Sequence, residues 1–212
     1  KEINIYLQCN EQKKYAIKKR IKSQLSKKDK VQIGGGTHYV DGFINIDITS
    51  PADIIYDVRK NIPLHSSSVQ VVFSEHFLEH IDFPHSVSVF FKEAHRILKS
   101  GGSLIVGVPD SGMAIKAYAE NNTFFLNKLK KEWYKKRKIY KNINCALDAF
   151  NLVIRDEDAD LKYNPHYWGY DKKGLTKLYK KFGFRKIKEW KFDKKIANAK
   201  REFGSIYMEG FK

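Results

Sequence analysis

The chain has 212 residues and a mass of 24.8 kDa, a length that suits one globular domain with a full core. Its 42% hydrophobic content excludes a largely disordered chain, and its apolar runs are too short to cross a bilayer. The net charge of +16 is unevenly placed, because residues 31–110 hold nine acidic and only five basic side chains. The basic flanks could attract nucleic acid, an anionic membrane or a phosphate-bearing substrate, or could simply form a solvated lysine-rich surface.

The first residues of the chain and its two cysteines limit the classes of protein that fit the sequence. Cys9 and Cys145 are too few and too far apart for a disulfide framework or a zinc knuckle, so we expect reduced thiols in a cytoplasmic protein. The first residues lack the long apolar stretch of a secretory signal. The sequence starts at Lys1 rather than at Met, which favours a processed end or a piece of a longer polypeptide.

The first half of the chain alternates apolar runs with turns. Residues 11–25 place apolar side chains among lysines at helical spacing, which predicts a basic amphipathic helix. After Pro84, helical spacing continues to Lys99, and the glycines that follow predict the end of that helix. The predicted strands are continuous apolar runs, so they indicate a mainly parallel sheet buried on both faces: VQIGG, FINIDI, ADIIYD, VQVVFS and SLIVGVP.

The second half changes character after Asp110. Residues 111–170 are basic and aromatic without strand spacing, which predicts a helical lid inserted into the domain. Asp171 and Gly183 then bound a predicted helix, and FRKIKEWKF and GSIYMEGF predict two closing strands. We therefore expect a single domain (1–212) made of four parts: a basic N-terminal helix (1–30), a cofactor-binding half (31–110), a lid (111–170), and a closing helix with strands (171–212).

The first candidate site is the glycine turn after the first strand. Gly34, Gly35 and Gly36 allow a ligand to approach the backbone, and Asp47 closes the next strand, where a carboxylate can accept hydrogen bonds from ribose hydroxyls. Asp47 follows Gly36 by 11 positions, against roughly 20 in dinucleotide-binding folds, so the first helix must be stunted or replaced by a loop. Without that helix the usual pyrophosphate site is missing, which favours a nucleoside without phosphates. A glycine turn beside a surface aspartate is the alternative.

The second candidate site is SEHFLEH, residues 74–80, at the predicted carboxyl end of a strand. His76, Glu79 and His80 match the H-x-x-E-H pattern of zinc proteases, so a metal pair is one hypothesis. The motif directly follows a strand and Pro84 comes soon after it, whereas a zinc-protease motif needs a long helix. We therefore expect no metal, and the alternative is histidines that only form hydrogen bonds at a helix start.

A set of motifs in order carries a family resemblance: VQIGGG, GFINIDIT, ADIIYDV, SEHFLEHI, EAHRILKSGGSLIVGVPD, HYWGYDKKGLTKLYKKFGF and SIYMEGFK. Residues 30–212 resemble class I S-adenosylmethionine-dependent methyltransferases, above all the type 11 branch associated with polysaccharide biosynthesis. The resemblance implies an α/β Rossmann-like fold with a seven-stranded, mostly parallel sheet whose last strand is antiparallel. It also implies S-adenosyl-L-methionine as cofactor, S-adenosyl-L-homocysteine as product, and cofactor contacts by Gly34, Gly35, Gly36, Asp47, Ile48, Asp57, Val58, Ser74 and Glu75.

The expected chemistry is transfer of the methyl group to a sugar hydroxyl of a glycan, for example of a deoxysugar such as rhamnose. An alcohol needs a general base to take its proton, and His76 is our first candidate, with His166 and Asp110 as alternatives. The expected partner is a glycan acceptor, together with a glycosyltransferase fused to the chain or acting with it. The candidates for substrate contact are Glu79, His80, Tyr167 and Trp168.

Other functions stay open at this point. The basic flanks favour an RNA acceptor, and a small metabolite is a further possibility, although no RNA-binding module is recognisable. A non-catalytic module that keeps the cofactor fold and binds a partner is an alternative of another class. A zinc hydrolase is the remaining one.

Overall fold

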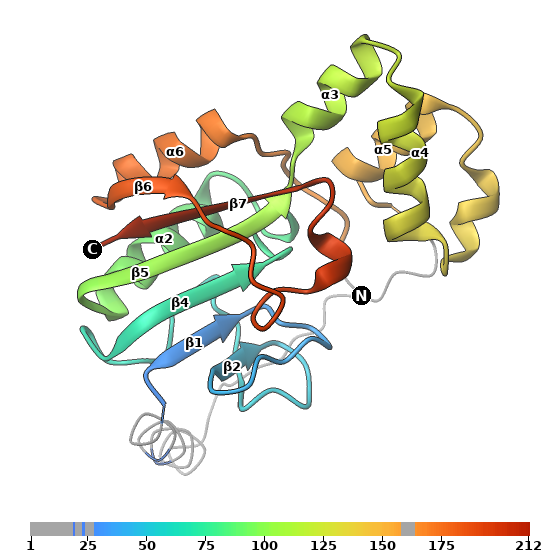
Figure 1. Ribbon diagram of the computed structural model, residues 1–212. Helices are drawn as coiled ribbons and strands as arrows, with labels where there is room; N and C mark the ends of the chain where they lie inside the picture. The colour runs from blue at the N-terminus through green and yellow to red at the C-terminus, as the bar shows by residue number, and fades with distance from the viewer. Residues whose placement is uncertain (1–18, 20–22, 24–27, 158–163) are drawn as a thin grey trace.

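The computed structural model describes residue 19, residue 23 and the ranges 28–157 and 164–212 (Figure 1). Most of the basic helix expected within residues 1–30 therefore lies outside the described residues. Within the described part of the chain, no helix combines the length and the apolar character needed to span a membrane.

Seven strands form one sheet in the order β3-β2-β1-β4-β5-β7-β6. The first five strands in this order pair in parallel, and β7 pairs antiparallel with both β5 and β6. The predicted Rossmann-like fold class is therefore confirmed. The strands are β1 (Lys30–Ile33), β2 (Ile44–Asp47), β3 (Ile54–Ile55), β4 (Val69–Glu75), β5 (Leu98–Pro109), β6 (Arg185–Glu189) and β7 (Ser205–Phe211).

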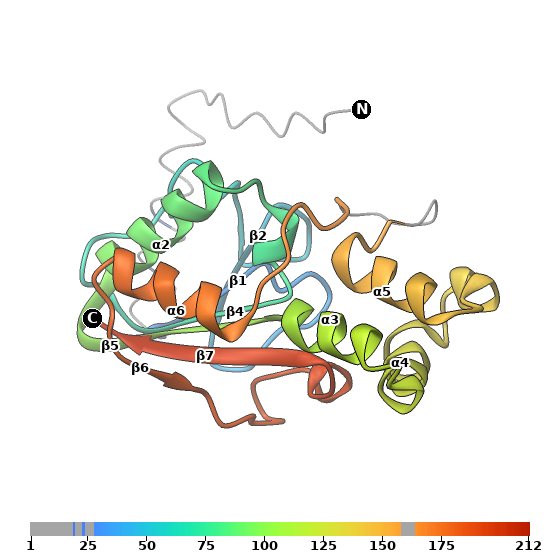
Figure 2. The same cartoon turned by 90° about the horizontal axis from the view of Figure 1, so that it is seen from above.

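Both faces of the central sheet are covered, as the continuous apolar strands predict. Helices α2 (His85–Ile97) and α6 (Lys172–Lys181) lie on one face, where Phe90, Phe91 and Tyr179 are fully buried (Figure 2). Irregular segments cover the opposite face and contribute a smaller core cluster that includes Phe43 and Ala197. Residues 34–43 contain turns and no helix, so the predicted replacement of the first helix by a loop is confirmed.

Two local predictions need correction. Helix α2 ends at Ile97 rather than at Lys99, and β5 already begins at Leu98. The glycines at 101 and 102 lie inside β5, at the place where its pairing with β4 shifts register after Val69. They therefore belong to an irregular part of the strand and do not end a helix. The run predicted over residues 52–57 forms only the two-residue strand β3.

The helical region after β5 lies beyond the carboxyl ends of the parallel strands (Figure 1). Its elements form a small core of their own, which includes Leu126, Leu129 and Leu152. That this helical region acts as a lid over the rest of the chain remains our proposal. The elements are α3 (Ser111–Ala119), α4 (Thr123–Leu129), the π-helix η2 (Lys130–Tyr134), the 3₁₀-helix η3 (Lys138–Asn142) and α5 (Ala146–Ile154).

Two further short 3₁₀-helices lie in the described part of the chain, η1 (Leu78–His80) after β4 and η4 (Ala199–Arg201) before β7. The predicted boundaries of α6 agree with the structure. The side chain of Asp171 accepts a 2.6 Å hydrogen bond from the amide of Gly174, and Gly183 follows the helix with φ +86°. Capping residues thus set where α6 begins and ends, and both residues can be recognised in the sequence.

Candidate active site

The glycine turn after β1 serves two different purposes. Gly34 and Gly36 have φ values of +69° and +57°, a region that favours glycine. A Cβ atom at Gly34 would lie 2.3 Å from the ring of Phe77, whereas one at Gly36 would meet no atom within 4 Å. Gly34 is therefore required by the packing of the chain itself, while Gly36 borders open space in which a ligand can approach the backbone.

Asp47 lies at the carboxyl end of β2, directly beside this turn. Its Oδ2 accepts a 2.9 Å hydrogen bond from the amide of Gly36, and its Oδ1 accepts bonds from the amide and hydroxyl of Thr49 at 3.0 and 2.9 Å. Ile48, the next residue, is exposed despite being apolar. The structure thus brings together the glycines, the carboxylate and an apolar side chain, which is the combination that a nucleoside needs.

Two other predicted cofactor residues lie near the end of β3. Asp57 forms a two-pronged ion pair with Arg59, with its shorter contact at 2.8 Å, and hydrogen bonding from Arg59 lowers the pKa of the Asp57 carboxyl. The side chain of Val58 is buried in the main core. Val58 can therefore face a ligand only through its backbone.

Ser74 and Glu75 end strand β4, with Ser74 paired in register beside Ile33. The Ser74 hydroxyl is buried and has no hydrogen-bond partner among the described residues. Glu75 accepts hydrogen bonds from the Tyr207 hydroxyl at 2.7 Å and from Arg201 at 3.2 Å. The Glu75 carboxylate therefore holds the segment before β7 against the sheet, and a contact between Glu75 and the cofactor stays a prediction.

His76 follows the strand in an unusual backbone conformation, with φ +51°. Its Nε2 lies 2.8 Å from the Ser205 hydroxyl, and its ring meets Trp133 edge-on with centroids 5.2 Å apart. Burial lowers the pKa of His76 well below its ordinary value, so the imidazole is neutral at pH 7. A neutral imidazole is the form that a general base requires.

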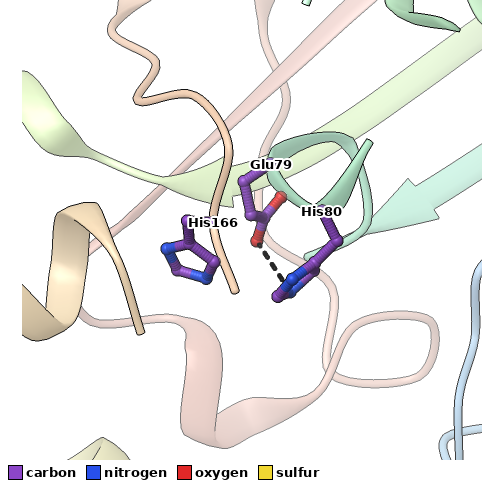
Figure 3. A group of neighbouring side chains, drawn as sticks. All are labelled: Glu79, His80 and His166. Carbon is purple, nitrogen blue, oxygen red and sulfur yellow. Dashed lines mark ion pairs between the residues drawn. The ribbon is translucent and has the colours of Figure 1, made fainter. Parts of the chain in front are cut away.

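A carboxylate and two imidazoles meet beyond the end of β4 (Figure 3). Nε2 of His80 lies 4.0 Å from Oε1 of Glu79, and the rings of His80 and His166 are 4.7 Å apart. Glu79 is 1% exposed, and burial raises the pKa of its carboxyl to about 8. Burial also lowers the pKa of His80 to about 4 and that of His166 below its ordinary value.

Backbone hydrogen bonds bring His166 to this position. The amide of Tyr167 donates to the carbonyl of Glu79 at 2.7 Å, and the amide of His166 donates to the carbonyl of Arg155 at 2.7 Å. The segment around His166 is thus fastened both to η1 and to the residue that follows α5. The sequence placed His166 in a lid but gave no sign that it would meet Glu79 and His80.

Asp110 caps the helix that follows β5. Its Oδ1 accepts a 2.9 Å hydrogen bond from the amide of Met113, and burial raises the pKa of its carboxyl. Among the described residues, no hydrogen bond joins Asp110 to a histidine. Its suggested role as a base stays a prediction.

A cavity of about 510 Å³ adjoins the histidine cluster. Tyr167 and Trp168 are 54% and 48% exposed. Trp168 also stacks on Phe83, with ring centroids 4.3 Å apart and planes 14° apart. His166 therefore connects the cluster to an aromatic-walled cavity, which is lined by Ile154, Arg155, Pro165, His166, Tyr167, Trp168 and Gly169.

The sequence gave no signal for several polar groups around this site. Arg201 and Tyr207 bind Glu75 from a distant segment, and the buried hydroxyls of Tyr170 and Ser111 have no hydrogen-bond partner among the described residues. Tyr170 differs from the others, because it belongs to the same HYWGYD motif as His166, Tyr167 and Trp168, and that motif already marks it as a candidate.

Comparisons with known proteins find one matching family and several similar folds. Residues 47–106 match a family described as a methyltransferase domain. No curated protein sequence matches the chain. A solved methyltransferase from Methanosarcina mazei, described as S-adenosylmethionine-dependent, is 16% identical with a TM-score of 0.53, and the alignment covers 91% of this chain and 96% of that one.

Two further solved structures have lower structural similarity. One is a Thermotoga maritima S-adenosylmethionine-dependent methyltransferase described as a possible histamine N-methyltransferase, with 18% identity, a TM-score of 0.48, and coverage of 95% of this chain and 94% of that one. The other is an Archaeoglobus fulgidus methyltransferase with 14% identity, a TM-score of 0.49 and the same two coverages.

The match over residues 47–106 and the fold together define the class of protein. It is an S-adenosylmethionine-dependent methyltransferase, an enzyme with S-adenosyl-L-methionine as its cofactor. This class leaves the methyl acceptor open, since one fold serves many substrates.

Proposed function

We propose that this enzyme transfers a methyl group to a hydroxyl of a sugar in a glycan. The cavity walled by Tyr167 and Trp168 carries this proposal, because it joins exposed aromatic side chains to the imidazole of His166, which also lines it. An aromatic face suits the apolar face of a sugar ring, and a few polar groups beside it can orient hydroxyls. The cavity adjoins the carboxyl edge of the sheet, where open α/β folds bind their ligands.

The proposed cofactor site is the glycine turn with its neighbours. Gly36 borders open space, Asp47 presents a carboxylate, and the buried Ser74 hydroxyl has no hydrogen-bond partner among the described residues. These observations fit a phosphate-free nucleoside with a polar amino-acid arm. Within this proposal, Ile48 and Asp57 flank the adenine, and Gly35 and Val58 contribute backbone.

S-adenosyl-L-methionine supplies an electrophilic methyl group on a sulfonium. The residues of the chain therefore need only to align the acceptor and to take its proton. We assign the proton to His76. When Nε2 of His76 donates to the Ser205 hydroxyl, Nδ1 keeps its lone pair and faces Oε1 of Glu79 at 3.7 Å.

A direct assay tests the proposal. The purified enzyme is incubated with isotopically labelled S-adenosyl-L-methionine and either uncharged rhamnose-containing oligosaccharides or RNA of equal concentration, at low and high salt. We expect label on the oligosaccharides at both salt concentrations, and slower transfer by His76→Gln. Label on RNA alone, lost steeply as salt rises, would replace the glycan with a nucleic acid acceptor.

A further inference from the structure

The side chains of Glu79, His80 and His166 bring their ligand atoms close together, while Nδ1 of each histidine is engaged with a backbone carbonyl. A carbonyl oxygen cannot donate, so Nδ1 of His80 must donate its proton to the carbonyl of Asn164, 2.6 Å away. For the same reason Nδ1 of His166 donates to the carbonyl of Val153, 2.8 Å away. In the neutral imidazole, the Nε2 atom of each ring then carries a lone pair.

This tautomer is the one that prepares histidine for a metal. Metal-binding histidines commonly donate their second N–H group to a backbone carbonyl or a carboxylate, which fixes the ring and the tautomer.

The third member of the cluster is a carboxylate without a donor. Glu79 is 1% exposed, and among the described residues neither of its side-chain oxygens has a hydrogen-bond partner. Burying a carboxylate that has no hydrogen-bond donor costs free energy of folding unless a proton or a cation accompanies it. The ligand atoms of Glu79, His80 and His166 all lie within 4.8 Å of one another, and the three side chains turn toward one another (Figure 3).

We propose that Glu79, His80 and His166 form a binding site for one divalent transition-metal ion such as Zn²⁺. Two imidazoles and one carboxylate suit zinc and its first-row neighbours, whereas Mg²⁺ and Ca²⁺ prefer oxygen ligands throughout. Zinc–ligand bonds of about 2.0–2.2 Å place neighbouring ligand atoms roughly 3.4 Å apart in a tetrahedron. Binding therefore requires ligand atoms that are up to 4.8 Å apart to move together by up to about 1.4 Å.

The site differs from the one that the sequence motif suggested. The H-x-x-E-H pattern pairs His76 with His80, but the structure engages Nε2 of His76 with Ser205 and brings His166 to Glu79 and His80 instead. Asp156 lies beside His166 at 4.0 Å but is held by Arg137 at 2.5 Å. The proposed metal set therefore joins a motif after β4 to one residue from the distant segment after α5.

Three protein ligands leave a coordination position for an outside molecule, as in catalytic zinc sites. A hydroxyl bound there would lose its proton more readily, because the metal stabilises the alkoxide, and Nδ1 of His76 could accept that proton. This role rests on the proposed function, whereas metal binding by the three side chains can be tested without any acceptor.

The test uses tag-free enzyme freed of metal by a chelator. Co²⁺ is titrated into it while the visible absorption is followed, and Zn²⁺ binding is then measured by competition. We expect one equivalent of Co²⁺ with the intense visible bands of a four- or five-coordinate site. We expect Glu79→Gln and His166→Ala each to weaken binding by at least about 100-fold, since even outer-shell partners are worth 10- to 100-fold.

A matched control is His65→Ala, which removes an exposed histidine outside the cluster and should leave Co²⁺ binding unchanged. Circular dichroism establishes that each variant is folded. Wild-type enzyme without a stoichiometric site, or a folded Glu79→Gln variant that binds as tightly as wild type, would overturn the proposal. Binding of S-adenosyl-L-homocysteine, measured on the same metal-free samples, separates failure of the metal site from failure of the cofactor site.

Discussion

The backbone amide of Gly36 donates a 2.9 Å hydrogen bond to Oδ2 of Asp47, which joins the turn after β1 to the end of β2. The backbone amide and the hydroxyl of Thr49 both donate hydrogen bonds to the other carboxylate oxygen of Asp47, Oδ1. Three donors thus orient the Asp47 side chain before any ligand arrives. Since each carboxylate oxygen accepts about two hydrogen bonds, Oδ2 keeps capacity for a ribose hydroxyl.

Asp47→Ala should weaken binding of S-adenosyl-L-homocysteine by at least about 10-fold, because a charged acceptor for the ribose is worth about 1.5–3 kcal/mol. Isothermal titration calorimetry measures the effect. Asp41→Ala is the matched control, since Asp41 is an exposed aspartate in the loop before β2. Equal affinities for all three proteins would show that the nucleoside does not contact the end of β2.

Alanine substitutions at Gly34 and Gly36 should separate packing from ligand binding. In Gly34→Ala the new methyl group would lie 2.7 Å from the Cβ atom of Phe77, which no side-chain rotation can move away. We expect a loss of about 3 kcal/mol in the free energy of unfolding, from overpacking together with a positive φ.

Gly36→Ala should cost only about 1 kcal/mol, from the positive φ alone, yet it should weaken cofactor binding several-fold. Urea denaturation and calorimetry on the same samples give both quantities. The interpretation fails if Gly36→Ala is the less stable variant of the two, or if it binds cofactor as well as wild type does.

Trp168→Ala should raise KM for the glycan acceptor by about 10-fold and leave kcat nearly unchanged, because a stacked aromatic contact is worth about 1–1.5 kcal/mol and lies away from the reacting atoms. Phe124→Ala is the control, since Phe124 on α4 is a more exposed aromatic side chain outside the cavity. Steady-state kinetics with varied acceptor concentration measure KM and kcat separately. A change confined to kcat would place Trp168 in a conformational or catalytic step instead.

The ion pair between Glu93 and Arg96 should make stability depend on pH. Hydrogen bonds from Arg96 lower the pKa of the Glu93 carboxyl below its ordinary value of 4.5, and the amide of Ile62 donates to the same carboxylate at 2.8 Å. Because the folded-state pKa is lowered, the stabilisation is present above pH 4.5 and is lost as the pH falls through the folded-state pKa.

Glu93→Gln should therefore reduce the free energy of unfolding by about 2 kcal/mol at pH 7, and this difference should shrink as the pH falls below about 4.5. Glu189→Gln, which breaks an exposed pair with Lys172, should cost less than about 1 kcal/mol at either pH. Thermal or urea unfolding at several pH values measures both. A constant Glu93→Gln effect down to pH 3 would show that charge does not carry the stabilisation.

Local sequence patterns predicted most of the sheet and the loop that joins its first two strands. Apolar runs bounded by turn residues encode strands directly, and the spacing between Gly36 and Asp47 was enough to predict a loop in place of the first helix. The capping residues Asp171 and Gly183 likewise marked α6 correctly, because a cap depends only on neighbouring residues. The end of α2 was misplaced, since the glycines after it could terminate a helix or interrupt a strand, and only pairing with β4 decides between the two.

The groups beyond the end of β4 depend on contacts that local pattern does not encode. Glu75 and Glu79 are four residues apart, yet Glu75 accepts hydrogen bonds from Arg201 and Tyr207 while Glu79 faces two histidines. The sequence by itself determined the order of the strands along the chain, the glycine turn and the acid beside it. Only the tertiary structure decided which distant side chains meet each carboxylate, because burial and long-range hydrogen bonds, such as that from Tyr167 to Glu79, exist only once the chain is packed.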